Sequence, residues 1–593
     1  GDLRMQNPYW IAYRNLRLNN KKRYMASAGL SYQILDWLNV AGRVRIDNTH
    51  SEYEGKLYAS SSNTLTDGSS QGHYTVNNGQ YSQTYADVLV NINKRIQDFT
   101  IVANIGASYS GVTSKELGYA GPIRETGIPN LFNVYDLDNA KKRATQVGWR
   151  EATESIFASA EVGWKSMLYL TVTGRNDWAS QLTHSPQASF FYPSVGLSAV
   201  ITEILKLPDW VDYLKVRGSF SSVGNPYPRF LTYPTYSYDA NKQDWKSQTN
   251  YPIGKLYPER TDSWEVGLDA TLFKDFKLSG SFYYANTYNQ TFDPRLPVSS
   301  GYDKLYVQTG YVRNYGFEAM LSYGHRWGDF GWDSSFTFSA NKNEIVELVK
   351  DYVHPETGKT YNVDKLELKT DEGRGFGKAK FILKEGGTLG DLYTHADLKR
   401  DINGNVLIDD SGNVTAIDNA GDIKLGSVLP KANLAWNNSF SYKGINAGFL
   451  LTARLGGIVY SATQAYLDLY GVSETSAAAR DAGGVWINGR SRVNPQSFYE
   501  VVASQSGLPT YYTYSATNLR LQEAHIGYTV PRRWLGNVCD INVSLVGRNL
   551  WMIYCKAPFD PEAVATTNNY YQGIDYFMMP STRNIGFNIK INF

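Results

Sequence analysis

Hydrophobic and polar residues alternate with a period of two through most of the chain. Around position 216, Leu214, Val216 and Phe220 fall on one face of an extended segment. Lys215 and Arg217 fall on the opposite face. This alternation is typical of a β-strand whose two faces meet different surroundings.

The same pattern recurs along the whole chain and predicts an all-β protein. We expect 17 strands, at 22–33, 38–47, 82–93, 99–109, 152–163, 168–175, 188–200, 212–222, 261–272, 276–287, 312–323, 331–341, 433–442, 446–455, 516–528, 540–548 and 584–593.

The connections between these strands alternate between short and long. The longest are residues 342–432 and 456–515, and we expect both to be extracellular loops. Outer-membrane barrels have short periplasmic turns and long extracellular loops, whereas a soluble sandwich has no reason to place every long loop at one end. The sequence therefore predicts a transmembrane antiparallel β-barrel, with apolar faces toward lipid and polar faces toward a wet lumen. Polar residues expected in that lumen include Lys215, Arg217, Asp333 and Glu161.

The final segment, 584–593, is an amphipathic strand that ends on an aromatic residue. Phe587, Ile589, Ile591 and Phe593 alternate with polar residues, and we interpret them as a terminal assembly strand. Aromatic residues recur at strand ends and fit the interfacial belts of membrane barrels. They include Trp37, Trp164, Tyr169, Trp178, Tyr192, Tyr213, Trp264 and Trp332.

Composition excludes several classes of protein. The 58 Lys and Arg residues balance 56 Asp and Glu, so a nucleic-acid partner is not expected. The mean hydropathy is −0.39, and no stretch approaches the roughly 20 apolar residues of a membrane-spanning helix. The seven histidines are scattered without metal-site spacing, and no catalytic constellation is present, so we expect no enzyme. Cys539 and Cys555 are expected to be unpaired.

Several short motifs, in a fixed order, resemble the SusC/RagA family of TonB-dependent outer-membrane transporters. Each is weak alone, but together they extend along nearly the whole chain. They are Asn7–Trp10 (NPYW), Gly174–Trp178 (GRNDW), Phe190–Gly196 (FFYPSVG), Pro258–Thr261 (PERT), Arg313–Glu318 (RNYGFE), Asn518–Leu521 (NLRL), Gly547–Leu550 (GRNL) and Phe559–Glu562 (FDPE).

The resemblance implies a 22-stranded barrel with an N-terminal plug, a SusD-like surface lipoprotein as a lid, and TonB-driven import of oligosaccharides or oligopeptides. The 17 strands would be the C-terminal part of that barrel, and the plug and the TonB-contacting region are not found in this sequence. We therefore expect either a longer polypeptide or a second chain that supplies them. The resemblance also implies contact with membrane lipid and allows a homodimer of transporter–lipoprotein pairs.

Three alternatives stay open at this point. The first is a TonB-dependent siderophore or cobalamin receptor, which shares the barrel without the lipoprotein lid. The second is a surface barrel that binds without transporting. The third is a secreted β-rich carbohydrate-active enzyme, which would leave the alternation of loop lengths unexplained.

Two loops are dense in Tyr, Asp and Asn, a mixture whose side chains stack on sugar rings or form hydrogen bonds to peptide backbones. They span 229–251 and 568–579. The alternative is that these aromatics pack the loops together or face the lid, and the choice between glycan and peptide stays open. The candidate substrate-binding residues are Tyr236, Tyr238, Asp239, Trp245, Tyr570, Tyr571 and Tyr576.

A cluster of oxygen-bearing side chains in the first long loop gives a candidate calcium site. Asp401, Asn403, Asn405 and Asp409 supply the ligand type that this cation prefers. The spacing departs from an EF-hand, because Val406 takes the place of the turn glycine. A solvated loop is the competing interpretation, and no other cofactor is expected.

Overall fold

The computed structural model describes residues 7–231, 237–239, 244–246, 250–251, 256–292, 304–305, 307–353, 358, 360–368, 377–564 and 572–592. In these residues, no helix is long and apolar enough to cross a membrane.

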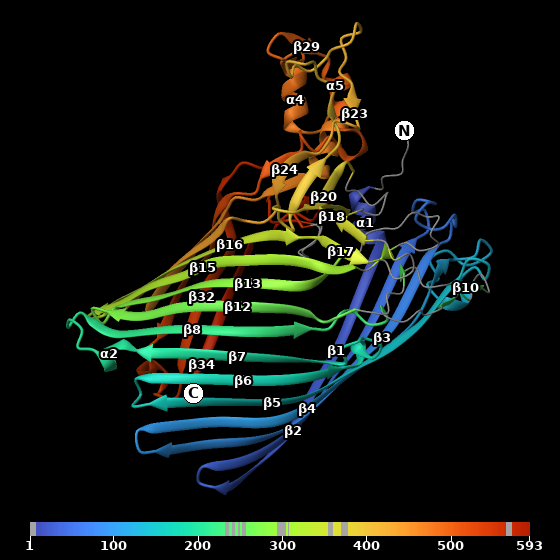
Figure 1. Ribbon diagram of the computed structural model, residues 1–593. Coiled ribbons are helices and arrows are strands. Elements are labelled where there is room, and N and C mark those ends of the chain that lie inside the picture. Colours follow the sequence, from blue (N-terminus) through green and yellow to red (C-terminus); the bar gives the residue numbers. More distant parts are fainter. Residues whose placement is uncertain are drawn as a thin grey trace.

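One antiparallel sheet of 17 strands forms most of the structure, and each strand pairs with its sequence neighbours in the sheet. Figure 1 shows this sheet curving round, so that β32 and β34 lie behind β6 to β13. All 17 predicted strands are present, which confirms the predicted fold class. They are β1 (Asn15–Leu35), β2 (Leu38–Tyr58), β3 (Gly72–Ile96), β4 (Phe99–Pro122), β5 (Arg143–Trp164), β6 (Leu168–Ala179), β7 (Ser189–Val200), β8 (Val211–Asn225), β12 (Glu259–Leu272), β13 (Phe276–Phe292), β15 (Val307–Trp327), β16 (Phe330–Glu347), β25 (Ala432–Tyr442), β26 (Ile445–Leu455), β31 (Asn518–Val530), β32 (Asp540–Cys555) and β34 (Asn584–Asn592).

The first five strands are longer than predicted, at the end that carries the long loops. β3, for example, begins at Gly72, whereas the alternation predicts a start at residue 82. Residues 72–81 are largely polar on both faces, so they carry no period-two signal. We infer that these extensions project beyond the hydrocarbon, where the ladder hydrogen bonds continue but neither face has to be apolar.

The two faces of the sheet differ as the alternation predicts. The face enclosed by the curvature, called the inner face here, carries charged side chains that pair across neighbouring strands. Arg23 Nε donates to Asp47 at 2.9 Å, and Arg43 Nε donates to Asp87 at 3.0 Å. The opposite, outer face exposes apolar side chains, of which Val216 is one. On the inner face, each of these charged side chains pairs with an opposite charge. Charged side chains on the outer face would have to be transferred into lipid at a large cost in free energy.

The two longest connections fold together into a separate lobe, which rises above the long-loop end of the sheet (Figure 1). We define the lobe as the described parts of 348–431, 456–517 and 572–575. Its regular elements are β17 (Val349–Val353), β18 (Thr360–Val363), β19 (Lys365–Leu368), β20 (Ala379–Lys384), β21 (Asp391–Thr394), β22 (Asp397–Leu398), β23 (Ala416–Ile417), β24 (Ile423–Ser427), β27 (Ile458–Ser461), α3 (Ala462–Leu469), α4 (Glu474–Asp481), β28 (Val485–Ile487), β29 (Ser491–Val493), α5 (Pro495–Val502), η4 (Ser504–Ser506), β30 (Thr513–Ser515) and β33 (Ile574–Asp575).

The lobe has a hydrophobic core of its own. Phe381 and Tyr460 are fully buried in it, together with residues from both long connections. The Tyr460 hydroxyl donates to the Ser506 carbonyl at 2.6 Å, and the Tyr512 hydroxyl donates to Asp468 at 3.0 Å. These bonds join strand β27 and helix α3 to the segment after α5, so the lobe is a packed unit.

Shorter elements lie at the two ends of the sheet. They are α1 (Pro8–Arg14), η1 (Val134–Asp136), η2 (Ser180–Leu182), α2 (Ile201–Ile204), β9 (Ser237–Asp239), β10 (Asp244–Lys246), β11 (Asn250–Tyr251), β14 (Lys304–Leu305) and η5 (Arg532–Leu535). Cys539 and Cys555 are both free thiols, as predicted.

The two edges of the sheet are β1 and β34. Within the described residues, β1 is hydrogen-bonded only to β2 and β34 only to β32. Phe587 and Ile589 of β34 pair with Leu545 and Val543 of β32, which are exposed apolar side chains, so the apolar positions of the last strand share one face of the sheet. Phe593 lies outside the described residues, and the role of this strand in assembly stays a prediction.

The facing of β8 gives the first testable prediction. Val216 lies on the outer face and is 39% exposed, whereas its neighbour Lys215 lies on the inner face. We expect Val216→Arg to destabilise the folded protein by about 2–4 kcal/mol, because it places a charge in lipid near mid-bilayer. Heat-modifiable migration on gels measures this loss, with Lys215→Arg as the matched control. Unchanged migration of Val216→Arg would contradict the facing.

Candidate functional site

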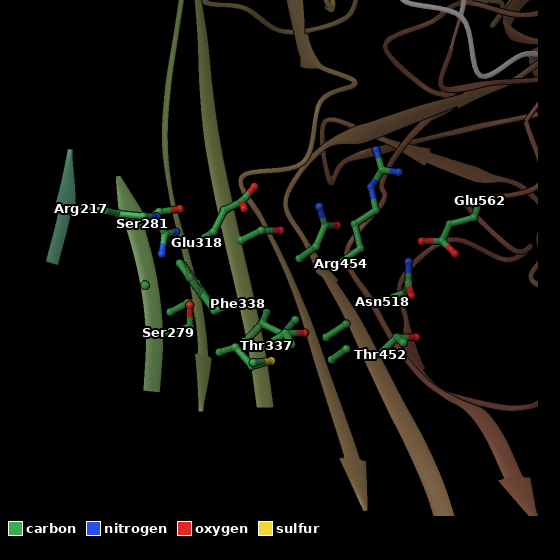
Figure 2. Close-up of a pocket in the computed structure, with 18 residues that line it drawn as sticks. Arg217, Ser279, Ser281, Glu318, Thr337, Phe338, Thr452, Arg454, Asn518 and Glu562 are labelled. Carbon is green, nitrogen blue, oxygen red and sulfur yellow. The ribbon is translucent and has the colours of Figure 1, made fainter. Parts of the chain in front are cut away.

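A row of polar side chains crosses the inner face of the sheet, perpendicular to the strands. The strand register places Glu318 opposite Ser339, Ser339 opposite Asn433, and Asn433 opposite Arg454. On one side the row continues through Ser281 and Gly267 to Arg217, and on the other it continues to Asn518. We call this set the polar row; it lines a cavity of about 640 Å³ (Figure 2).

Two charges are neutralised, that of Arg217 at one end of the polar row and that of Glu562, which lines the cavity beside the other end. The Arg217 guanidinium contacts Asp269 at 2.6 Å and Glu265 at 3.5 Å. Beside the other end, Glu562 contacts Arg520 at 3.1 Å.

Arg520 also contacts Asp560 at 2.7 Å, and these two side chains are only 6% and 10% exposed. Their pairing fixes the loop after β32 against β31 at the margin of the cavity. Buried charges of this kind need such partners to be tolerated.

Two charges in the middle of the row have no ion-pair partner among the described residues. They are Glu318 and Arg454, which Figure 2 shows on separate strands of the cavity wall. Arg454 donates from Nη2 to the Val428 carbonyl at 2.7 Å, while its buried Nε has no hydrogen-bond partner. The cavity wall therefore carries one carboxylate and one guanidinium that have no ion-pair partner among the described residues.

A second hollow, of about 1,090 Å³, lies on the opposite face of the sheet, between β1 and β6. Leu30, Val44, Val88 and Ile156 are among the exposed apolar side chains around it. Because it opens on the face predicted to contact lipid, we do not consider it a site for a polar ligand.

The loop after β8 carries two of the predicted substrate-binding residues. Tyr238 on β9 and Trp245 on β10 are directly paired across the hairpin, with ring centroids 5.2 Å apart. They are 53% and 65% exposed, so an aromatic surface is available to a ligand. Asp239 pairs with Asp244 in the same hairpin, whereas Tyr236, Tyr570 and Tyr571 lie outside the described residues.

Tyr576, the remaining candidate, packs at the edge of the lobe. Its ring lies 5.3 Å from that of Phe577, which in turn lies 5.3 Å from Tyr466. Partial burial raises the pKa of Tyr576. For this residue the packing interpretation describes the observed contacts, and no contact in the described residues joins it to Tyr238 or Trp245.

The loop that carries Tyr238 and Trp245 is attached to the sheet at its base. The Arg229 guanidinium lies 3.7 Å from the ring centroid of Trp149 and is ion-paired with Glu151, both on β5. Cation–π contacts of this kind stabilise by about 0.5–2 kcal/mol.

Buried side chains complete the attachment. Tyr227, Leu231 and Leu256 belong to a hydrophobic cluster with Leu182, in the loop between β6 and β7, and Phe190, on β7. In addition, the Ser185 hydroxyl donates to the Leu256 carbonyl at 2.6 Å. Both ends of the loop are therefore fixed while its aromatic pair is exposed.

The predicted calcium residues form a tight turn in the structure. The Asp401 carboxylate accepts the backbone N–H groups of Asn403 and Asn405, both at 2.8 Å. These bonds, with one from the Asn405 side chain, lower the pKa of Asp401. Asp409 accepts backbone N–H groups in the same way, from the residues two and four positions later. In the described part of the chain no group of three or more His, Cys, Asp or Glu side chains is placed to hold a metal, so calcium binding stays a prediction.

Sequence reasoning located only part of the polar row. Arg217 was expected on the inner face and lies there, in the polar row. Asp333 was also expected on the inner face and lies there, but it pairs with Arg326 at 3.3 Å, away from the cavity. Glu318 and Arg454 were missed. Period-two alternation indicates which face a residue occupies, but the row depends on the register between eight strands, which that alternation does not give.

Attachment of the loop by Arg229 generates a second prediction. We expect Arg229→Ala to accelerate amide exchange at 227–231 and 256–258 by roughly 5- to 30-fold, because an ion pair and a cation–π contact are lost together. Hydrogen–deuterium exchange measures this, and Arg150→Ala, at an exposed neighbour of Glu151, is the control. Equal exchange in the two variants would contradict the attachment.

An ion cluster in the lobe generates a third prediction, on pH. Lys365 and Lys384 hydrogen-bond to Asp422 at 2.6 Å and 2.7 Å, and they lower the pKa of Asp422 from 3.8 to about 2. A carboxyl with a lowered pKa contributes stability that is present above pH 3.8 and is lost as the pH falls toward 2. Asp422→Asn should therefore weaken exchange protection of β19 and β20 at pH 5, with the difference from wild type vanishing near pH 2. A difference that persists at pH 2 would contradict this account.

A family model described as TonB dependent receptor-like, beta-barrel matches residues 2–550. TonB-dependent receptor P3 of Formosa agariphila is 23% identical over 99% of this chain and 60% of that protein. TonB-dependent receptor SusC of Bacteroides thetaiotaomicron is 24% identical over 67% of this chain and 40% of that protein.

Among solved structures, that of the RagAB peptide transporter matches with a TM-score of 0.74 and 17% identity, over 99% of this chain and 63% of that chain. At this identity the likeness concerns the fold. The chain spans 60% of the length of P3 and 40% of the length of SusC.

Proposed function

Since the chain belongs to the TonB dependent receptor-like β-barrel family, we propose that it forms the wall of a transporter that imports oligomeric nutrients, either oligosaccharides or oligopeptides. The predicted resemblance to SusC and RagA is confirmed, and the protein is located in the outer membrane. The observation that carries the proposal is the polar row, which lines an open cavity on the inner face below the long-loop end.

The sidedness of the sheet is part of this proposal. The described parts of the two long connections form most of the lobe, and we assign the lobe to the cell surface. The short turns at the other end would then face the periplasm. Support comes from the general rule that extracellular loops of such barrels are longer than their periplasmic turns.

Partners follow from the same family membership. We assign a SusD-like surface lipoprotein to the long-loop end, where the lobe and the Tyr238–Trp245 hairpin are exposed. Energy for import would come from the TonB complex. The outer face would contact membrane lipid, and a homodimer of transporter–lipoprotein pairs stays a prediction. Family membership favours a transporter over an enzyme.

Uptake in intact cells tests the function directly. Cells that produce the protein should accumulate a labelled oligomeric nutrient, and deletion of the gene, loss of TonB or addition of an uncoupler should each abolish accumulation. A surface lipoprotein should copurify with the protein in mild detergent. Ligand binding without energy-dependent uptake would contradict transport, and uptake without any lipoprotein would contradict the proposed partner.

A further inference from the structure

A carboxylate lies between two exposed aromatic side chains on the outer face of the sheet. Glu154 on β5 pairs directly with Tyr109 on β4 and with Trp178 on β6, so the three residues, called the outer row here, lie side by side across neighbouring strands. Tyr109 and Trp178 are 43% and 42% exposed, and Glu154 is exposed as well. An ionised side chain on a face that contacts lipid is costly, so such a residue is a candidate for function.

The outer row lies at the border of the apolar band, at the end of the sheet that carries the long loops. Trp164, at the short-turn end of β5, is ten positions further along than Glu154, which corresponds to about 33 Å of extended strand. Strands of membrane barrels tilt by about 35–45°, so this length spans the roughly 25 Å of the apolar band. The Tyr109 ring lies over Gly111, with its hydroxyl toward the long loops. Glu154 is therefore at the level of the lipid headgroups.

The protein supplies no cation beside Glu154. Within the described ranges its carboxylate has no ion-pair partner, and the nearest other positions on the outer face of β4, β5 and β6 are uncharged. They are Ala107, Gly111, Ala152, Ile156 and Asn176. A plug would occupy the lumen and contact the inner face, so it would leave the outer row accessible. A cation that pairs with Glu154 therefore approaches from the membrane.

The outer row also borders the hollow of about 1,090 Å³ between β1 and β6, called the outer hollow here. Small residues recess the outer face within it, between larger apolar side chains such as Val88 and Ile156. The small residues are Ala28, Gly42, Ala86 and Ala107. Five strand spacings of about 4.8 Å separate β1 from β6 by about 24 Å. The hydrocarbon of one leaflet is about 15 Å deep, so an acyl chain fits within this extent.

From these observations we infer that the outer hollow binds a membrane lipid, with an acyl chain in the hollow and an ammonium headgroup at Glu154. The carboxylate pairs with the ammonium group, and the rings of Tyr109 and Trp178 on either side add cation–π attraction. Two observations select this occupant. The outer face of an outer-membrane protein contacts lipid, and the charge of Glu154 is complementary to an ammonium group but repels a headgroup that carries only phosphate.

Photoactivatable lipids test this assignment. The full-length protein is reconstituted in phosphatidylglycerol vesicles that contain a small fraction of phosphatidylethanolamine with a diazirine on one acyl chain, or of its N-acetyl derivative, which lacks the ammonium charge. Peptide mass spectrometry then measures labelling of β4–β6, with the outer face of β12 and β13 as the internal reference. In the wild type, β4–β6 should be labelled about tenfold more by the ammonium lipid, because acetylation removes one charge-assisted bond. β12 and β13 should be labelled equally by both lipids.

Three variants separate the headgroup from the acyl chain. Glu154→Gln should make the labelling of β4–β6 equal for the two lipids. Ala107→Phe fills part of the hollow and should lower labelling by both lipids. Glu52→Gln removes an exposed carboxylate on the outer face of β2, outside the hollow, and should behave as wild type. Heat-modifiable migration of every variant shows whether the barrel is intact.

Three results would overturn the inference. Equal labelling of wild-type β4–β6 by the two lipids would show that the headgroup is not recognised. A preference for the ammonium lipid that persists in Glu154→Gln would show that another group binds it. Protection of β4–β6 from both lipids by a copurifying protein would show that the hollow is a protein interface. None of these readouts depends on nutrient uptake, so this inference and the proposed transport function fail separately.

Discussion

Backbone hydrogen bonding in a medium without water is the constraint on which this structure depends. Each unpaired N–H or C=O group costs several kcal/mol in hydrocarbon, so the chain can cross the membrane only as strands that satisfy one another. The continuous ladder from β1 to β34 is the consequence. Once the ladder exists, side chains alternate strictly between lipid and lumen. Polar side chains that would be intolerable in lipid are gathered on the inner face, where Asp47, Asp87 and Asp269 each pair with an arginine on the adjacent strand.

The long connections lie in water, so their structure is determined by the burial of apolar side chains. They fold round buried apolar groups as a soluble protein does, and the lobe encloses Phe381, Tyr460 and Tyr512 in this way. The wall and the lobe meet near Arg454, whose guanidinium reaches the Val428 carbonyl at the base of the lobe. A ligand held between these parts would therefore contact a rigid sheet on one side and a packed loop domain on the other.

The difference between segments in lipid and segments in water also determines how much of the structure could be predicted from the sequence. Alternation located every strand of the wall, because lipid and water act on opposite faces and leave a period of two. It failed at residues 72–81, where β3 is largely polar on both faces. It also failed for contacts that depend on distant segments. Arg229 stacks on Trp149, 80 positions earlier, and nothing local to either residue indicates that pairing. Glu318 and Arg454 share a row only because four strands pair in one register, which the short-range pattern does not specify.

The candidate loop residues show the same limit. The density of Tyr, Asp and Asn directed attention to Tyr238 and Trp245, and the structure exposes both as a pair. The same compositional signal selected Tyr576, which packs against Phe577 beside the lobe. Composition indicates a surface rich in hydrogen-bonding aromatics, but it does not separate rings that face a ligand from rings that face their neighbours.

Site-directed labelling along β8 tests the central claim, that one face of the sheet meets lipid and the other meets a water-filled lumen. Single cysteines would be introduced at consecutive positions, as Leu214→Cys, Lys215→Cys, Val216→Cys and Arg217→Cys, after replacing the free thiols Cys539 and Cys555 by serine. In intact outer membranes, a charged water-soluble maleimide should label positions 215 and 217, and a lipid-soluble maleimide should label positions 214 and 216. Labelling of all four positions by the water-soluble reagent, or the reverse alternation, would contradict the account.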